Sequence, residues 1–218
     1  MMRPDLLRLY LVADPDHTPG DLVPTIAAAL AGGVTLVQLR AKRLTDREQL
    51  ALAVRLREIC SGQDVPLIIN DRVDIALAAA AAGVHLGVDD LPVAHARALA
   101  AEGFLIGYSP ETDDQIARAA ANGADYLGVG PVYGTRTKDD AGAALGLAEF
   151  ARRCDGSTLP VVGIGGITCA NAAPVIHAGA NGVAVVSAIL DAPDPADAAR
   201  RLRDAVDEAR QEITSPTR

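Results

Sequence analysis

Three polar side chains in the run QLRAK are suited to binding an anion. Side chains on an extended strand alternate in direction, so Gln38, Arg40 and Lys42 project to the same side. An amide, a guanidinium and an ammonium group on one face form a clamp for a polyanion. Lysine is otherwise nearly absent, because only Lys42 and Lys138 are lysines among the 20 lysine and arginine residues. The run is therefore a candidate anion site, and the competing interpretation is a strand end with solvated charges.

Two carboxylates follow neighbouring strand-like runs and are candidate ligands of a hard cation. Asp71 lies in INDRVD and Asp90 in HLGVDD, with no cysteine cluster or histidine pair nearby. Mg²⁺ fits this pattern, since it binds one or two protein carboxylates together with substrate phosphates. Helix N-capping explains the two residues equally well. By spacing alone, Asp89 is as good a candidate as Asp90.

A third group of polar and glycine residues lies in the C-terminal half. The run GPVYGTRTK carries the hydroxyls of Thr135 and Thr137 and the ammonium group of Lys138. The later runs GIGGI, which contains Gly166, and VVSAI, which contains Ser187, suit a phosphate site built from backbone N–H groups.

The sequence offers neither a covalent nucleophile nor a dinucleotide site. His85 lies within a strand-like run, so we expect it to pack or to orient a neighbour rather than to act as a base. There is no Ser-His-Asp or Cys-His set, and the GxGxxG fingerprint is missing.

Eight short apolar runs, separated by segments of helical spacing, must position these side chains. The runs are apolar almost throughout rather than alternating, as in parallel strands that are buried on both faces. Eight strand–helix repeats predict an α/β protein of one domain, a (β/α)8 TIM barrel, whose strand C-termini form the active face. An open doubly wound sheet is the alternative. The runs cover residues 9–14, 35–40, 65–70, 83–87, 104–109, 126–132, 160–167 and 182–189.

Local signals mark several helix ends. Thr45, followed by Glu48, predicts a capping box that opens a helix through residues 50–59. The motifs AGGV, AAGV, ANGA and HAGA predict helix C-termini at which glycine adopts a left-handed conformation. We expect a single domain over residues 1–218, with a flexible tail over residues 211–218.

Composition and charge limit the class of protein. Half of the 218 residues are hydrophobic, and the net charge of -8 argues against nucleic acid or an anionic membrane as partner. Small anionic substrates need only a few local cations and are not excluded. No apolar run approaches the roughly 18 residues of a membrane span, and the 3 cysteines lack metal-binding or disulfide spacing. We expect a cytoplasmic protein that acts on small molecules, with homo-oligomer formation left open.

Six motifs occur in an order that is typical of one family. They are QLRAK, INDRVD, GVHLGVDD, ADYLGVGPVYGTRTK, VVGIGGIT and GVAVVSAI, and they extend over nearly the whole chain. In these motifs the sequence resembles the thiamine-phosphate synthases. The resemblance implies a transferase that joins hydroxymethylpyrimidine diphosphate to hydroxyethylthiazole phosphate, releasing thiamine phosphate and pyrophosphate with Mg²⁺ as cofactor.

The resemblance also implies roles for individual residues. Asp71 and Asp90 would bind Mg²⁺, with Asp90 favoured over Asp89 by its place in the motif. The catalytic residues would be Arg40, Lys42, Ser109 and Lys138. The pyrimidine diphosphate would be bound by Gln38, Leu39, Arg40, Ala41, Lys42, Asn70, Ser109 and Lys138. The thiazole phosphate would be bound by Thr135, Arg136, Thr137, Gly166, Val186 and Ser187.

Three positions depart from the family pattern. Val88 stands where the family has glutamine, Ala41 stands where it has glutamate, and Pro110–Glu111 replaces a pair that often contains histidine. These departures bear on how the substrate is oriented rather than on the class of reaction.

Other functions on the same barrel remain as alternatives. A thiazole tautomerase needs no diphosphate clamp, so Asp71, Asp90 and the TRTK run argue against it. A sugar-phosphate epimerase or an indole-pathway enzyme needs an acid–base pair that the strand ends lack. A non-catalytic sensor of a thiamine precursor would keep the pocket and bind without turnover.

Overall fold

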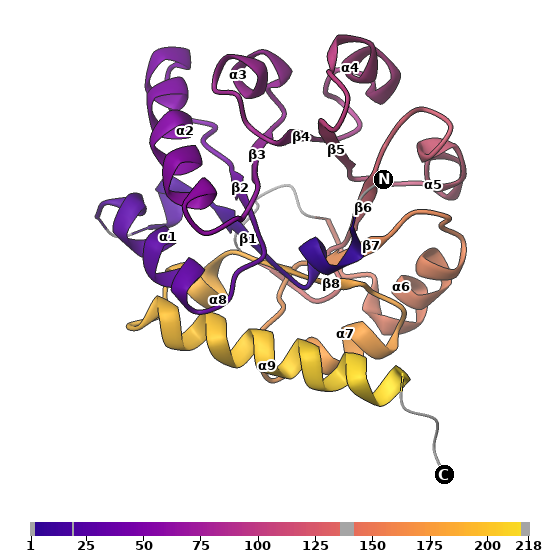
Figure 1. The fold of residues 1–218 in the computed structure, drawn as a ribbon. Helices are drawn as coiled ribbons and strands as arrows, with labels where there is room; N and C mark the ends of the chain where they lie inside the picture. Colours follow the sequence, from indigo (N-terminus) through magenta and orange to yellow (C-terminus); the bar gives the residue numbers. More distant parts are fainter. Residues whose placement is uncertain (1–2, 19, 136–141, 215–218) are drawn as a thin grey trace.

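Eight parallel strands close into a barrel in the computed structural model, which describes residues 3–18, 20–135 and 142–214. Each strand pairs with the next and β8 pairs with β1, so the predicted (β/α)8 fold is confirmed (Figure 1). Because all the strands are parallel, their C-terminal ends share one face of the barrel. The strands are β1 (Leu9–Ala13), β2 (Leu36–Leu39), β3 (Leu67–Asn70), β4 (Gly83–Leu86), β5 (Leu105–Tyr108), β6 (Tyr126–Val129), β7 (Val161–Ile164) and β8 (Gly182–Val185).

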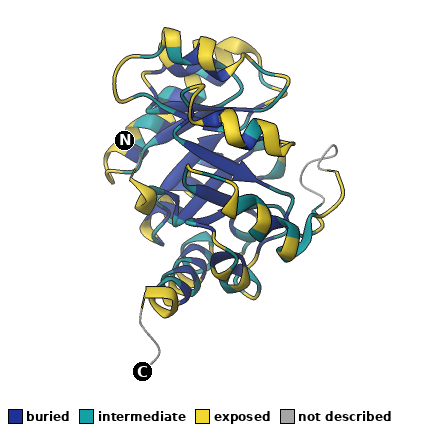
Figure 2. Cartoon of the chain, turned by 90° about the vertical axis from the view of Figure 1, so that its right-hand side faces the viewer, coloured by how far each residue is buried: buried dark blue, intermediate teal, exposed yellow. Residues whose placement is uncertain are grey.

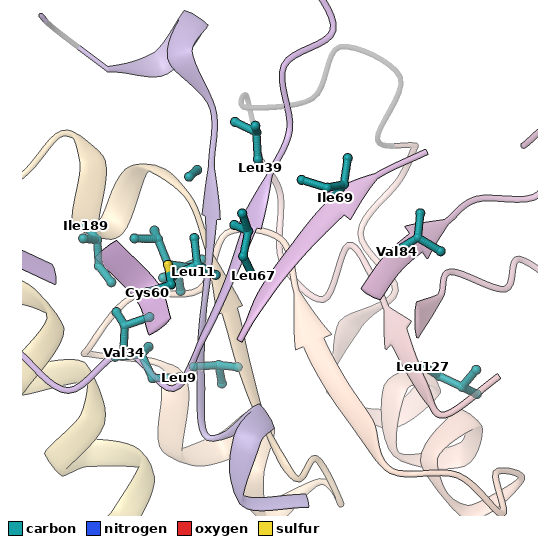
Figure 3. Close-up of a cluster of buried hydrophobic side chains, with 14 of the residues drawn as sticks. Leu9, Leu11, Val34, Leu39, Cys60, Leu67, Ile69, Val84, Leu127 and Ile189 are labelled. Atoms are coloured by element: carbon teal, nitrogen blue, oxygen red, sulfur yellow. The ribbon is translucent and has the colours of Figure 1, made fainter. Parts of the chain in front are cut away.

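Side chains on the strands alternate between the barrel interior and the layer beneath the helices. On β1, Tyr10 and Val12 belong to a small interior cluster, whereas Leu9 and Leu11 belong to the larger cluster that the helices cover. Figure 3 shows part of this larger cluster, in which the labelled side chains are aliphatic except for Cys60 with its buried sulfur. Interior positions near the strand C-termini are thereby left to carry the polar residues of a site.

Helices surround the barrel with their outer faces exposed, while the strands inside are buried (Figure 2). The predicted capping box is confirmed, because Thr45 and Glu48 exchange side chain–backbone hydrogen bonds at the start of α2. The helices are α1 (Leu22–Ala31), α2 (Asp46–Ser61), α3 (Val73–Ala78), α4 (Val93–Leu99), α5 (Asp113–Ala119), α6 (Gly146–Asp155), α7 (Ala172–His177), α8 (Ser187–Leu190) and α9 (Pro195–Thr214). Two short 3-10 helices, η1 (Pro4–Leu7) and η2 (Pro15–His17), flank β1.

The glycine prediction is confirmed at three motifs and wrong at the fourth. Gly33, Gly123 and Gly179 have positive φ, as expected beyond a helix end. In AAGV, however, Gly83 opens β4, and Ala80 takes the positive φ instead. Close packing against β5 requires glycine at position 83, since a Cβ there would lie 2.1 Å from a backbone carbonyl oxygen of β5.

Several predicted boundaries are also wrong. The runs over residues 126–132 and 160–167 extend beyond the ends of β6 at Val129 and β7 at Ile164. The run over residues 182–189 is not all strand, because β8 stops pairing with β1 at Val185 and the chain turns into α8. Residues 211–214, predicted as tail, continue α9, where the Thr214 hydroxyl donates to the Arg210 carbonyl. Residues 215–218 lie outside the described residues. No helix in the described part of the chain has the length and apolar character needed to cross a membrane.

Candidate active site

A cavity of about 420 Å³ opens at the C-terminal ends of the strands, and its wall is formed by residues of seven of the strands and by Ser109, which directly follows β5. This volume is within the range of small-molecule sites. Three predicted residues, Arg136, Thr137 and Lys138, lie outside the described residues. The predicted residues that line the cavity are Gln38, Arg40, Lys42, Asn70, Asp71, Asp90, Ser109, Thr135, Gly166, Val186 and Ser187.

The clamp on β2 and its following turn has the expected alternation. Gln38, Arg40 and Lys42 line the cavity. Leu39 and Ala41 point the other way, because both side chains are buried in the cluster beneath the helices. Their predicted contribution to substrate binding is therefore restricted to backbone atoms.

Arg40 is held in place by a buried carboxylate. One guanidinium nitrogen of Arg40 forms an ion pair and hydrogen bond with Oδ2 of Asp14, whose side chain is 1% exposed. The other carboxylate oxygen of Asp14 accepts the backbone N–H of Asp16 at 3.0 Å, and its carbonyl accepts the Thr18 hydroxyl at 3.0 Å. Because these two hydrogen bonds from its own turn fix Asp14, it presents Arg40 to the cavity in a defined position.

The two predicted metal ligands lie together beside Lys42. Burial first, and then a hydrogen bond and repulsion from Asp90, raise the pKa of Asp71, while Lys42 acts in the opposite direction. Lys42 Nζ is 3.4 Å from Asp71 Oδ2, and Asp90 Oδ2 accepts the Gly87 backbone N–H at 2.7 Å. Asp89 lines the same cavity but is exposed. The structure thus brings Asp90 to Asp71, as the family motif implied.

Asp71 has a left-handed backbone, with φ of +63°. This conformation costs a residue other than glycine about 1–2 kcal/mol. The strained turn is anchored by a 2.8 Å hydrogen bond from the Asp71 N–H to the carbonyl of His85 on the adjacent strand. Strain of this kind persists where the surrounding structure enforces it, and here it accompanies a carboxylate on the cavity wall.

The carboxylate pair fits a magnesium site. Two neighbouring carboxylates that repel each other, one of them partly buried, are stabilised by a divalent cation. Among the described residues, no group of three or more His, Cys, Asp or Glu side chains could hold a metal. Mg²⁺ suits two carboxylates, because it keeps several waters and takes further ligands from substrate phosphates.

A buried polar chain lies beneath the clamp. Gln38 Nε2 is 2.6 Å from the Tyr10 hydroxyl, which is 2.8 Å from the Tyr126 hydroxyl. His85 Nδ1 is 3.1 Å from the Tyr126 hydroxyl, and His85 Nε2 is 2.8 Å from Ser109 Oγ. Burial lowers the pKa of His85 to about 4 and raises the pKa values of Tyr10 and Tyr126. All three groups are therefore neutral near pH 7, which agrees with the prediction that His85 orients a neighbour.

The opposite side of the cavity is formed by tightly packed loops. The Tyr133 N–H donates to the Gly165 carbonyl at 3.1 Å, which links the loops after β6 and β7. A Cβ on Gly166, whose φ is +63°, would lie 2.4 Å from the Gly134 carbonyl oxygen, so this close approach requires glycine. Thr135 and Gly166 thus line one continuous wall, which Ser187 completes at the start of α8.

Three residues of the site were missed in the prediction from sequence. They are Asp14, Tyr10 and Tyr126, none of which belongs to the polar groups identified from the sequence. The alternation of LYLVAD places Tyr10, Val12 and Asp14 on one face of β1, so this signal was available. Of the positions that depart from the family pattern, Val88, Pro110 and Glu111 line the cavity.

The closed parallel barrel, with a strand-end cavity, a cationic clamp and a carboxylate pair, defines a class: barrel enzymes that act on small phosphorylated substrates. Residues 9–189 match the profile of the family described as thiamine monophosphate synthase. The chain belongs to this family.

Curated relatives and a solved structure support the assignment over almost the full length. A thiamine-phosphate synthase of Albidiferax ferrireducens is 47% identical, with 94% of each chain aligned. One of Methanoculleus marisnigri is 48% identical, over 94% of this chain and 97% of its own. The solved thiamine phosphate pyrophosphorylase of Pyrococcus furiosus is 36% identical with a TM-score of 0.86, covering 94% of this chain and 98% of its own.

Proposed function

We propose that this protein joins hydroxymethylpyrimidine diphosphate to hydroxyethylthiazole phosphate, forming thiamine phosphate and pyrophosphate. The observation that carries the proposal is the convergence of Arg40, Lys42, Asp71 and Asp90 on one cavity, in a chain of this family. The reaction expels a diphosphate, and these residues supply cations and a metal site where its charge would develop.

The reaction needs no nucleophile or strong base from the protein. The bond between the pyrimidine methylene carbon and the diphosphate oxygen breaks, and its electron pair leaves with pyrophosphate. The methylene carbon becomes cation-like with electron donation from the ring amine, and the lone pair of the thiazole nitrogen forms the new C–N bond. No proton has to be removed, so catalysis consists of positioning and electrostatic stabilisation.

The diphosphate would bind at the clamp. Arg40 supplies a fork of N–H donors whose direction is set by Asp14, and Lys42 supplies a compact charge beside Asp71. Lys138, which the family motif assigns to the same substrate, would add a further cation. Asn70 and Ser109, on the cavity wall, would hold the pyrimidine diphosphate by hydrogen bonds.

Asp71 and Asp90 would hold Mg²⁺. When bound, the ion supplies positive charge that stabilises the departing diphosphate. Supporting this are the proximity of the two carboxylates, the raised pKa of Asp71 and its strained backbone turned to the cavity. Lys42 would keep the carboxylate of Asp71 ionised and ready to bind the cation.

The thiazole phosphate would bind at the opposite wall, at Thr135, Gly166, Val186 and Ser187, together with Arg136 and Thr137 of the family motif. Placing the two phosphorylated groups at opposite walls brings the thiazole nitrogen and the methylene carbon together between them. A cytoplasmic location is part of the proposal and is supported by the three cysteines, all of which are free thiols.

The test is to incubate the protein with both substrates and Mg²⁺ and to quantify thiamine phosphate and pyrophosphate. We expect the two products in equal amounts, dependent on both substrates and abolished by EDTA. Lys42→Ala and Asp71→Ala should each lower kcat by orders of magnitude while the circular dichroism spectrum is unchanged. Binding of the thiazole phosphate without product would contradict the proposal and favour a sensor, and isomerisation of a thiazole precursor would favour a tautomerase.

A further inference from the structure

A hydrogen-bonded chain crosses the barrel interior from β2 to the end of β5. It connects Gln38 through Tyr10, Tyr126 and His85 to Ser109. Gln38, Tyr10, His85 and Ser109 line the cavity, but Tyr10 and Tyr126 are at most 1% exposed and His85 is 9% exposed. The chain is therefore a buried connection between two residues of the proposed pyrimidine site.

The direction of every hydrogen bond in this chain follows from its first member. The amide nitrogen of Gln38 can only donate, so it donates to the Tyr10 hydroxyl. The Tyr10 proton must then be donated to Tyr126, since in the reverse direction this buried proton would lack an acceptor among the described partners. The Tyr126 proton in turn is donated to His85 Nδ1.

The same reasoning determines the protonation state of the imidazole ring. Because Nδ1 of His85 accepts from Tyr126, the proton of the neutral ring is on Nε2 and is donated to Ser109 Oγ. A doubly protonated ring would donate to Tyr126 from Nδ1, and one of the two buried tyrosine protons would then lack an acceptor among the described partners. With its oxygen accepting from His85, the Ser109 hydroxyl has its own proton available for the cavity.

We propose that Tyr10, Tyr126 and His85 are positioning residues that make the Ser109 hydroxyl a hydrogen-bond donor to the bound pyrimidine diphosphate. The acceptor is a ring nitrogen or a diphosphate oxygen, both of which carry lone pairs. The assignment of this substrate rests on the proposed function, whereas the direction of the chain does not. If the Ser109 hydroxyl rotated freely, it would for part of the time turn a lone pair rather than its proton toward the substrate. A ring nitrogen and a diphosphate oxygen are both acceptors and could not hydrogen-bond to that lone pair.

The barrel is built to accommodate this chain. A Cβ on Gly107 would lie 2.3 Å from His85 Nδ1 and 2.4 Å from the Tyr126 hydroxyl oxygen. A Cβ on Gly128 would lie 3.1 Å from His85 Cε1. Glycine at these two interior positions of β5 and β6 leaves the room that the imidazole and phenol rings occupy.

The first experiment measures the tautomer directly in the substrate-free protein. Protein labelled with ¹⁵N-histidine is examined by long-range ¹H–¹⁵N correlation at pH 7, and the His85 signals are identified by their absence in His85→Asn. We expect a protonated Nε2 and an unprotonated Nδ1. The opposite tautomer, or a ring protonated on both nitrogens, would overturn the proposal whether or not the protein makes thiamine phosphate.

The second experiment is a double-mutant cycle with Tyr126→Phe and Ser109→Ala, measured as kcat/KM for the pyrimidine diphosphate. We expect Tyr126→Phe to lower kcat/KM on the order of tenfold, as for loss of one oriented hydrogen bond. In the Ser109→Ala background the same change should have almost no further effect, because Tyr126 acts through Ser109. Equal effects in both backgrounds would show a purely structural role and would overturn the proposal.

Tyr108→Phe is the matched control. Tyr108 is the neighbour of Ser109 at the end of β5, but it packs against the cluster beneath the helices rather than lining the cavity. Loss of its hydroxyl should leave kcat/KM and the His85 tautomer unchanged. If the enzyme makes no thiamine phosphate at all, the proposed function fails, and the tautomer experiment still decides the direction of the chain.

Discussion

The carboxylate of Asp14, buried at the end of β1, holds the guanidinium group of Arg40 at the edge of the cavity. Only a fifth of the Arg40 side chain is exposed. Asp14, which belongs to none of the binding motifs, thereby sets the position of Arg40, a residue of the clamp. This relationship, together with the carboxylate pair and the buried polar chain, leads to four predictions.

Asp14→Asn is expected to weaken both stability and substrate binding. The change leaves a partly buried guanidinium without its counter-charge, which costs about 3 kcal/mol of unfolding free energy. Arg40 then loses its fixed direction, and the KM for the pyrimidine diphosphate rises about tenfold. Urea denaturation and steady-state kinetics measure the two effects. Asp16→Asn is the control, because Asp16 pairs at 3.4 Å with Arg43, whose side chain is 80% exposed, and such pairs contribute little.

Asp71→Asn is expected to have opposite effects with and without Mg²⁺. Burial and Asp90 raise the pKa of Asp71, so the ionised form is disfavoured in the folded protein and the neutral asparagine should increase stability without metal. The variant should require at least about tenfold more Mg²⁺ for half-maximal activity, since a ligand is lost. Thermal unfolding with EDTA and with Mg²⁺, and a Mg²⁺ titration of activity, measure both.

Asp74→Asn is the control for Asp71→Asn, because Asp74 forms a surface ion pair with Arg72 and its side chain is 65% exposed. It should leave the Mg²⁺ requirement unchanged. An Asp71→Asn protein with the wild-type Mg²⁺ requirement would contradict the assignment of Asp71 as a ligand.

We expect the free energy of unfolding to decrease as the pH falls, because of His85. Its pKa is lowered to about 4 in the folded protein, against an ordinary value of 6.5, so below about pH 6.5 the unfolded chain binds a proton that the folded one does not. Stability from this residue is therefore complete above about pH 6.5 and is lost progressively down to about pH 4, by roughly 3 kcal/mol.

Denaturation at several pH values between 4 and 7 tests this dependence. His85→Asn removes the titrating group, so its unfolding free energy should vary less over this interval than that of the wild type. His95→Asn, a change at a surface histidine, should keep the wild-type slope. Equal slopes for His85→Asn and the wild type would refute the assignment.

Gly107→Ala is expected to destabilise the barrel. The added Cβ would lie 2.3 Å from both His85 Nδ1 and a ring carbon of Tyr126, and these buried rings have little freedom to move. Overpacking of this kind costs about 1–3 kcal/mol of unfolding free energy. The variant should also lose activity, because the hydrogen bonds from Tyr126 through His85 to Ser109 are displaced. Gly156→Ala is the control, since its Cβ would be 3.6 Å from the nearest atoms; similar stabilities of the two variants would contradict this account.

Much of the architecture could be predicted because it depends on local periodicity. Continuous apolar runs identified buried parallel strands, and the pairing of Thr45 with Glu48 identified the start of α2. Boundaries such as the end of β8 could not be predicted, because Ser187 to Leu190 is as apolar as the strand before it. Whether this segment continues as strand depends on its pairing with β1, which lies far away in the sequence and extends to Ala13, two residues beyond its last pair with β8.

Clamp and metal residues were predictable for a related reason. Gln38, Arg40 and Lys42 line one side of the cavity because the alternation of β2 continues into the residues that follow it, and barrel topology brings all strand ends to one rim. Asp90 could be chosen over Asp89 only by resemblance to a family, because spacing leaves both beside the cavity. The structure distinguishes them physically, since Asp90 lies close enough to Asp71 to raise its pKa, whereas Asp89 is exposed.

The sequence by itself determined the barrel, the family and the polar residues at the strand ends, because each depends on a pattern within one segment. Tertiary structure alone decided which polar groups meet: Asp14 with Arg40, and Tyr126 with both Tyr10 and His85. These partners are separated by 26 to 116 residues along the chain. No local periodicity relates them, and only closure of the strands into a barrel brings their side chains into one buried interior.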